Sequence, residues 1–422
     1  MRFLTLIAMV LALSRSTLLA QPFTLEALID ESIRNNLSLK AERSNLTIAE
    51  ARQITAALRP NPILSLGVQY LDILGTHFGP TNNAGPAEYD LRTDFILEGG
   101  KKRTRRIELA AEDRRLAELN FRESLRGLIV DVQSAFVDVL FRMDGLALAE
   151  ENRKNFQSLV SINETRVKNG DLAQVELERS RIAALQFDNA ILQAQSDLLQ
   201  AKYKLQQLLG RQEASDHFEI TGELRRDKLQ ATREEIYQRA LLQRPDYLAM
   251  QQLLIRNQAD LRLQVANGKI DYTVGAEARR QDGYAGRGNS MAVFLTMPLP
   301  VFNRNQGEIA RASREGDQTK FRVDAMANRI QSEVRMAWQQ YESATALLNR
   351  IEGDMLKRAE EVRKTTDYSY RRGEASLVEL LDAQRAFNDT RQSYNEMRGA
   401  YARALYQLES IEAKNVAEGV KK

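Results

Sequence analysis

This chain of 422 residues contains no cysteine, and proline, histidine and tryptophan are scarce. Without cysteine it has no disulfide bond, and no N-terminal cysteine that could be acylated. Neither residues 87–244 nor the chain after Val301 contains any of the 8 prolines, so helices there meet no proline breaker. No phosphate-binding loop and no HExxH motif occurs, which argues against nucleotide hydrolysis and that kind of zinc site.

The histidines are His77, in a Gly/Pro-rich stretch, and His217, beside Asp216 in a polar stretch. A Ser–His–Asp hydrolase would have to use one of them, yet neither has a nucleophile-elbow sequence nearby. We interpret both as isolated surface residues. The sequence therefore predicts that the protein is not an enzyme and needs no cofactor.

The N-terminal residues 1–20 predict a secretory signal peptide, because Arg2 precedes an apolar run that ends in a short polar stretch closing at Ala20. Its removal would lower the net charge from +3 to +1, so the composition gives no argument for nucleic acid. No other segment approaches the length of a transmembrane helix.

The chain reads as a tandem duplication. Residues 24–67 match residues 232–275, and VKNGDLAQVELERSR (residues 167–181) matches YRRGEASLVELLDAQR (residues 370–385) in the same order. We expect a first repeat over residues 21–210, a linker over 211–231, a second repeat over 232–413 and a polar tail over 414–422. A period this long indicates duplicated domains rather than a short-repeat solenoid.

Leu and Ala interleaved with Glu, Arg and Gln are typical of long helices. Helices are expected over residues 25–36, 39–58 and 101–168, over 233–243, 247–266 and 306–371, and after each of the two repeated turns. An apolar stripe at spacings of 3 and 4 runs along the helix expected over residues 306–371: Ile330, Val334, Ala337, Tyr341, Ala344, Leu348, Ile351 and Met355.

Between these helices the apolar period becomes 2, which predicts two strands in each repeat. Leu64, Leu66, Val68 and Tyr70 share one face of the first, and GTHFGPTNNAGPA (residues 75–87) and DGYAGRGN (residues 282–289) are expected as loops. The length and alternation are typical of outer-membrane strands. Four strands cannot close a barrel in lipid, so either these are ordinary soluble hairpins or several copies of the chain pool their strands.

The duplicated plan, FILEGGKKRTRRIELA (residues 95–110), PLPVFNRNQGEIARA (residues 298–312) and the two turns resemble the TolC-like outer membrane efflux proteins, over residues 23–411. The basic run and VFNRNQGEI are most similar to the branch that serves cobalt–zinc–cadmium efflux. The resemblance implies a mainly α fold with a small β part. A homotrimer would form a twelve-stranded outer-membrane β-barrel, four strands per chain, continued by an α-helical barrel in the periplasm.

By the same resemblance, the protein would be the passive outer-membrane channel of a tripartite efflux system. Its partners would be a periplasmic adaptor, an inner-membrane pump, with the resistance-nodulation-division class as one candidate, and outer-membrane lipid. Divalent heavy-metal cations are the expected cargo. Drug efflux and type I secretion remain alternatives for such a channel, and a periplasmic coiled-coil structural protein is the alternative of another class.

The resemblance also places adaptor docking at the two turns, Asn169, Gly170, Asp171, Leu172 and Ala173, and Arg372, Gly373, Glu374, Ala375 and Ser376. Glycine suits the left-handed end of a helix, and Asp171, Glu374 and Ser376 suit the start of the returning helix. Any hairpin of two helices would need the same residues, so the pattern alone leaves docking open.

Three residues near the second turn correspond to the family's periplasmic aperture: Tyr370, Glu379 and Asp382. Glu379 and Asp382 lie three positions apart on one helix face, and threefold symmetry would collect six carboxylates around one axis. Such a ring would attract cations, and repulsion would raise some of its pKa values. Two solvated acids on an exposed face are the alternative. The basic residues Lys101–Arg106 are expected in a solvated position near the strands.

Overall fold

A computed structural model describes residues 22–71, 73–75, 87–283 and 286–414 of the chain. The predicted signal peptide, His77 and residues 415–422 of the predicted tail lie outside these ranges.

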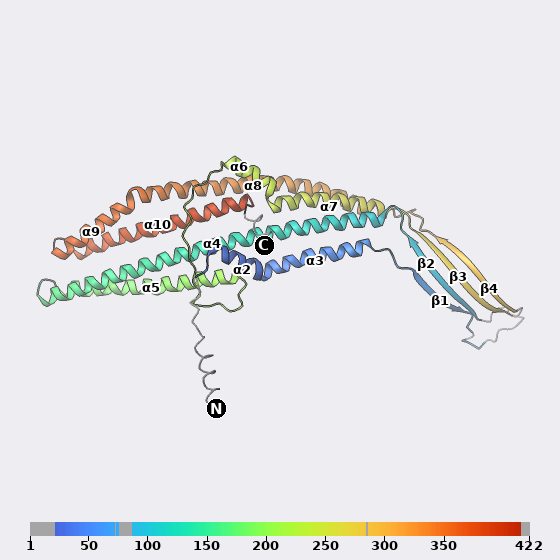
Figure 1. The fold of residues 1–422 in the computed structure, drawn as a ribbon, viewed down its shortest axis with the longest axis horizontal. Coiled ribbons are helices and arrows are strands. Elements are labelled where there is room, and N and C mark those ends of the chain that lie inside the picture. Colours follow the sequence, from blue (N-terminus) through green and yellow to red (C-terminus); the bar gives the residue numbers. More distant parts are fainter. Residues whose placement is uncertain (1–21, 72, 76–86, 284–285, 415–422) are drawn as a thin grey trace, which may run out of the picture. The chain divides into compact units, whose positions relative to one another are not determined.

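The helices follow the predicted plan in both repeats (Figure 1). Thr24 and Thr232, which the repeat aligns, both cap a helix with their side chains, and at Thr232 a Glu235 carboxylate completes a capping box. The first repeat contains α2 Leu25–Asn35, α3 Leu37–Ala57, α4 Lys102–Lys168 and α5 Gln174–Leu208. The second contains α6 Arg233–Gln243, α7 Pro245–Asn267, α8 Gln306–Arg350, a π-helical turn η1 Ile351–Met355, α9 Leu356–Arg372 and α10 Leu377–Ile411.

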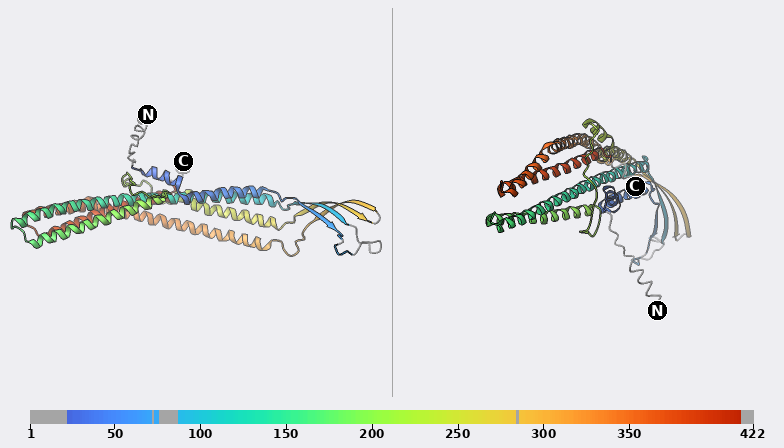
Figure 2. Two further views of the ribbon diagram at one scale, coloured as in Figure 1. Left: turned by 90° about the horizontal axis from the view of Figure 1, so that it is seen from below. Right: turned by 60° about the vertical axis from the view of Figure 1, so that its left-hand side comes forward.

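The chain divides into two compact units, and both repeats contribute to each of them. Of the described residues, the first unit comprises 22–41, 122–244 and 329–414, and it holds the hairpins α4–α5 and α9–α10. Both views in Figure 2 draw the two helices of each hairpin side by side. The second unit comprises residues 42–121 and 245–328, and holds all four strands.

The strands form one antiparallel sheet in the order β1 Ile63–Gln69, β2 Glu88–Leu97, β3 Tyr272–Gly283 and β4 Gly286–Thr296. Two predictions about where the strands end were wrong. Tyr70 lies beyond the end of β1 with a positive φ of 54°, so it does not continue the strand. Most of the expected loop DGYAGRGN is strand, because β3 and β4 stay paired up to Gly283 and Gly286.

The predicted alternation is confirmed for the central strands β2 and β3, whereas in β1 and β4 the residues of both faces are mostly exposed. Apolar side chains on one face are exposed, Leu66 by 76% and Val293 by 80%, whereas Glu88 and Glu277 on the other face retain only 5% and 9% exposure. The sheet therefore turns its apolar side outward and its charged side inward, the reverse of a soluble sheet. Among the described helices, none combines the length and the apolar character needed to cross a membrane.

The apolar stripe predicted along α8 and η1 is confirmed up to Ile351, but the prediction is wrong at Met355. Ile330, Val334 and Leu348 are buried, but Met355 is 44% exposed because the π turn inserts one extra residue into the helix. Beyond the turn the inward positions are shifted by one: Leu356 is half-buried, Val362 is exposed and Tyr370 is buried.

The basic run Lys101–Arg106 is solvated only in part: Lys101 and Arg103 are exposed as expected, but Lys102 is not. Lys102 is buried and pairs with Asp271 at 2.7 Å, while Arg106 pairs with Glu98. The Arg103 guanidinium donates to the carbonyl of Ala57 at 2.6 Å. These contacts fix the start of α4 against the ends of α3 and β2 and the start of β3.

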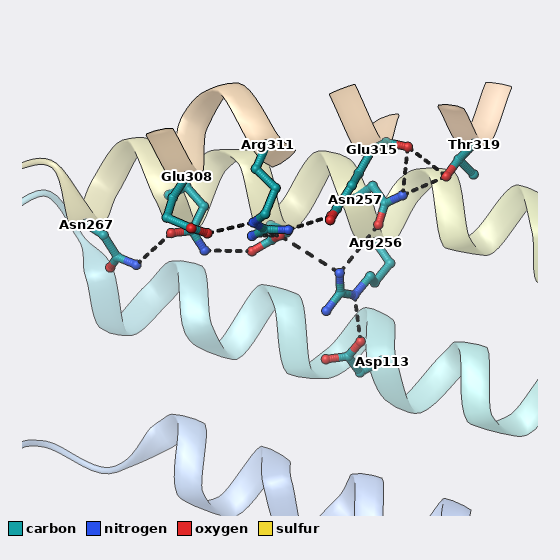
Figure 3. Close-up of polar contacts among 10 residues, drawn as sticks. Asp113, Arg256, Asn257, Asn267, Glu308, Arg311, Glu315 and Thr319 are labelled. Atoms are coloured by element: carbon teal, nitrogen blue, oxygen red, sulfur yellow. Dashed lines mark hydrogen bonds and ion pairs between the residues drawn. The ribbon is translucent and has the colours of Figure 1, made fainter. Parts of the chain in front are cut away.

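A second polar network fixes α8 on α7 within the same unit (Figure 3). The Arg311 guanidinium donates to Glu308 and Glu315 on its own helix, each at 2.6 Å, and to Asp260 of α7 at 3.1 Å. Further along, Asn257 donates to Thr319 Oγ1 at 2.8 Å. Asp260 is almost fully buried, so Arg311 supplies the opposite charge that such burial requires.

Candidate functional site

The turn of the first hairpin follows Lys168. Gly170 has a φ of 81°, which glycine adopts without the strain that a Cβ would cause, and the Asp171 N–H donates to the carbonyl of Arg166 at 2.8 Å. Asp171 does not cap the returning helix, because the N-cap of α5 is Ala173 and no side chain caps it; a role for Asp171 as a partner of the helix dipole stays a prediction. Asn169, Gly170, Asp171 and Ala173 are exposed, and Leu172 is half-buried.

In the second turn the glycine has the same left-handed conformation, but the returning helix begins with a side-chain cap, which the first turn lacks. Gly373 has a φ of 79°, and Ser376 caps α10 as predicted, in a capping box with Glu379. Glu374 instead pairs with Arg372 at 3.4 Å, with both side chains mostly exposed. Gly373 and Ser376 are exposed as well, whereas Ala375 packs against an apolar cluster.

Glu379 and Asp382 are both exposed on α10 but differ in their contacts. The Glu379 carboxylate accepts hydrogen bonds from the Ser376 N–H at 2.6 Å and from its hydroxyl at 2.9 Å. These bonds, the backbone one above all, lower the pKa of Glu379 below its ordinary value. Asp382 has only a loose contact with Arg385, at 3.9 Å. The six-carboxylate ring stays a prediction.

Tyr370 is 3% exposed and lies where the two hairpins meet. Its hydroxyl donates to Asn163 Oδ1 on α4 at 3.0 Å, and the Arg166 guanidinium of α4 donates to the Tyr370 carbonyl at 3.2 Å. Burial raises the pKa of the Tyr370 hydroxyl, which therefore stays protonated as a donor. The apolar cluster around it draws on both hairpins: Phe156, Leu159, Ala183, Leu377 and Leu380.

Asn163 and Arg166 are the residues of this contact that the sequence analysis missed. Asn163 follows Leu159 at a spacing of 4, so it interrupts an apolar face of α4 and is fully buried. A polar residue on such a face is the available signal, because a buried amide needs a hydrogen-bonding partner. The sequence could not indicate that the partner is Tyr370, more than two hundred positions later.

Elsewhere along this seam, α4 also meets α10 through polar contacts. Gln384 donates to Asn152 Oδ1 at 2.9 Å, and both side chains are buried. Nearer the start of α4, Arg398 pairs with Asp144 at 3.0 Å and Arg126 donates to Ser410 Oγ at 2.8 Å. Water can replace hydrogen-bonding partners when such a seam opens, so each contact contributes only about 1 kcal/mol net.

The linker between the repeats contacts both α10 and η1. Arg225 donates to Asp227 at 2.8 Å and to Glu409 of α10 at 2.6 Å, and the Tyr401 hydroxyl donates to the Asp227 carbonyl at 2.9 Å. The neighbouring Arg226 pairs with Glu352 in η1. The linker thus holds the π turn and α10 together.

His217 is exposed, and its neighbour Asp216 accepts a hydrogen bond from the Tyr203 hydroxyl at 2.5 Å. Within the part of the chain that the structure describes, no group of three or more His, Asp or Glu side chains could hold a metal ion.

Comparison with known proteins adds the family. The family model described as outer membrane efflux protein matches the chain twice, over residues 28–211 and 236–412. The cobalt-zinc-cadmium resistance protein CzcC of Cupriavidus metallidurans is 26% identical over 93% of this chain and 90% of its own length. The cation efflux system protein CusC of Escherichia coli K12 is 23% identical over 67% of this chain and 62% of its own length.

Among solved structures, the outer membrane channel CmeC of Campylobacter jejuni has a similar fold. It superimposes with a TM-score of 0.78 at 13% sequence identity, over 94% of this chain and 88% of CmeC. At this identity the likeness concerns the fold alone.

Proposed function

Since this chain belongs to the family of outer membrane efflux proteins, we propose that it is the outer-membrane channel of a tripartite efflux system for divalent metal cations. The single observation that supports the channel function is the orientation of the sheet faces, with the apolar face exposed and the charged face shielded. The exposed apolar face suits lipid and the charged face suits a water-filled interior. A helical tunnel in the periplasm would continue such a channel.

The assembly that we propose is a homotrimer. The sheet order leaves β1 and β4 at its edges, and an open edge in lipid would leave backbone groups without partners. Three copies that pair β4 of one chain with β1 of the next supply twelve strands, enough to close a barrel around an aqueous channel. A periplasmic adaptor and an inner-membrane pump complete the proposed system.

Metal cargo is supported by two relatives whose names refer to cobalt, zinc and cadmium resistance and to cation efflux. A deletion strain is expected to lose growth in zinc, cobalt or cadmium at concentrations that the parent tolerates, and to regain it when this gene is restored. Parallel plates with amphiphilic drugs provide the comparison. Sensitivity to drugs alone would contradict the metal cargo and leave the channel in place. No sensitivity to either would argue against efflux.

We propose that the exposed turns around Gly170 and Gly373 dock the adaptor. Gly373→Pro is expected to abolish metal resistance while heat-modifiable trimers still form, because proline cannot adopt a φ of 79°. Gly373→Asn is the matched control, since asparagine tolerates the left-handed conformation, and it should retain resistance. Full resistance with proline at this position would remove the docking role.

We also propose that Glu379 and Asp382 line the periplasmic aperture. Replacing both acids by their amides, Glu379→Gln and Asp382→Asn, is expected to lower cation selectivity measured as the reversal potential in a salt gradient across a planar bilayer. Glutamine can still accept the Ser376 hydrogen bonds, so helix capping is kept. An unchanged reversal potential would remove the aperture assignment.

The lowered pKa of Glu379 sets the pH range over which the capping box of α10 contributes stability. The Ser376 N–H favours the carboxylate, so Glu379 keeps its charge as pH falls through the ordinary value of 4.5 and loses it only below the lowered value. The capping contribution is likewise present above the ordinary pKa and lost below the lowered one. A thermal stability that, relative to the Glu379→Gln variant, already falls above pH 5 would contradict this.

A further inference from the structure

On the inward side of the sheet, four carboxylates share two arginines. We define the polar face as Glu88, Asp90, Arg92, Asp94, Glu277 and Arg279, from β2 and β3. Arg279 lies directly opposite Asp90 and contacts three carboxylates: Asp90 at 2.8 Å, Glu277 at 3.0 Å and Glu88 at 3.4 Å. Those three carboxylates are almost fully shielded, each with at most 10% of its side chain exposed.

Arg92 serves the remaining carboxylate of the polar face. It contacts Asp94 at 3.0 Å, and its guanidinium lies 4.4 Å from the ring centroid of Phe294 on β4. Opposite Asp94 stands Gly275, where a Cβ would lie only 2.2 Å from Asp94 Oδ1. The glycine therefore leaves the space that Asp94 occupies, and both arginines are held at fixed positions among the acids.

The polar face thus carries four carboxylates and two guanidinium groups, a net charge of two negatives per chain. We propose that Arg279, together with Arg92, determines the ion selectivity of the channel within the sheet, by limiting a wall that would otherwise carry four negative charges. This inference rests on the proposed channel function, because it requires the polar face to line the aqueous interior.

Fixed charges on the wall of a pore change the local concentration of mobile ions within about one Debye length, roughly 10 Å at 0.1 M salt. Removing the Arg279 charge would raise the net negative charge of the polar face by half, and threefold repetition would multiply the effect. The cation preference of the pore should then increase, most clearly at low ionic strength.

A charge series on the purified trimer tests the proposal, with the reversal potential measured in a KCl gradient across a planar bilayer. Arg279→Gln is expected to raise the potassium-to-chloride permeability ratio by about twofold, and Glu277→Gln to lower it. The double variant Glu277→Gln/Arg279→Gln restores the net charge and should return to the wild-type ratio. The double variant also controls for misfolding. In Arg279→Gln the Glu277 carboxylate loses its arginine, whereas the double variant no longer has that carboxylate.

Arg280→Gln is the matched control, since neighbouring side chains on a strand point to opposite faces and Arg280 lies on the apolar one. Its ratio should equal that of the wild type. A ratio that stays constant across the series while channels form would overturn this inference and leave the channel function intact. An equal shift in Arg280→Gln would overturn it as well. Absence of any conductance, including from the wild type, would overturn both.

Discussion

Insertion of one alanine after Gly353 is expected to abolish metal resistance, whereas deletion of Gly353 is expected to preserve it. The turn η1, Ile351–Met355, already contains one residue more than an α-helix would. Deletion would return this segment to regular α-helix, with Leu356 and Tyr370 still facing inward. A further inserted residue would rotate α9 by about 100° against α8, because an α-helix has 3.6 residues per turn.

That rotation would turn Tyr370 away from Asn163 and bring the exposed Val362 towards the interior. Growth in zinc and the amount of heat-modifiable trimer are the measurements. Gly353→Ala keeps the residue count, and its Cβ would meet nothing within 4 Å, so it controls for the substitution itself. Equal resistance in the insertion and deletion variants would mean that the orientation of α9 does not depend on this turn.

The strands and the long helices could be predicted because their signals are periodic. Leu64, Leu66 and Val68 alternate with other residues along β1 and share one face, as expected. The same reasoning failed at Met355, since a periodic stripe assumes a uniform helix and the π turn breaks that assumption at one place. No glycine or proline rule marks η1 clearly, although Gly353 lies within it.

Local turn chemistry was predicted for one hairpin and not for the other. Ser376 with Glu379 three residues later is a capping box that can be recognised in the sequence. In the first hairpin the aligned segment has Ala173 at the N-cap and no capping side chain, so the similarity to the second turn does not extend to its cap.

The sequence also did not indicate ion pairs between residues that are far apart in the chain. Lys102 looked solvated because its acidic partner Asp271 is recognised only once the starts of α4 and β3 are brought together. Likewise, Arg279 and Asp90 are ordinary polar positions on two strands until the register places them opposite each other. Composition and spacing contain no information on such register.

Tyr370→Ala is expected to increase the single-channel conductance, because it removes a buried aromatic contact between α9 and α4. Loss of a buried aromatic side chain costs about 3 kcal/mol or more, and Asn163 and Arg166 would lose their aromatic neighbour at the same time. The polar contacts that remain along the seam contribute little net free energy when water can replace them. The second hairpin should therefore move away from the first more often.

Two variants separate this effect from general damage to the hairpin. Tyr370→Phe keeps the ring in its cluster and loses only the hydrogen bond to Asn163, worth about 1 kcal/mol, so its conductance should lie between wild type and Tyr370→Ala. Tyr368→Ala, two residues earlier and 59% exposed, should leave conductance unchanged. If Tyr370→Ala and Tyr368→Ala conducted alike, the hairpins would not be held together by Tyr370. The polar seam between α4 and α10 would then have to keep them in place.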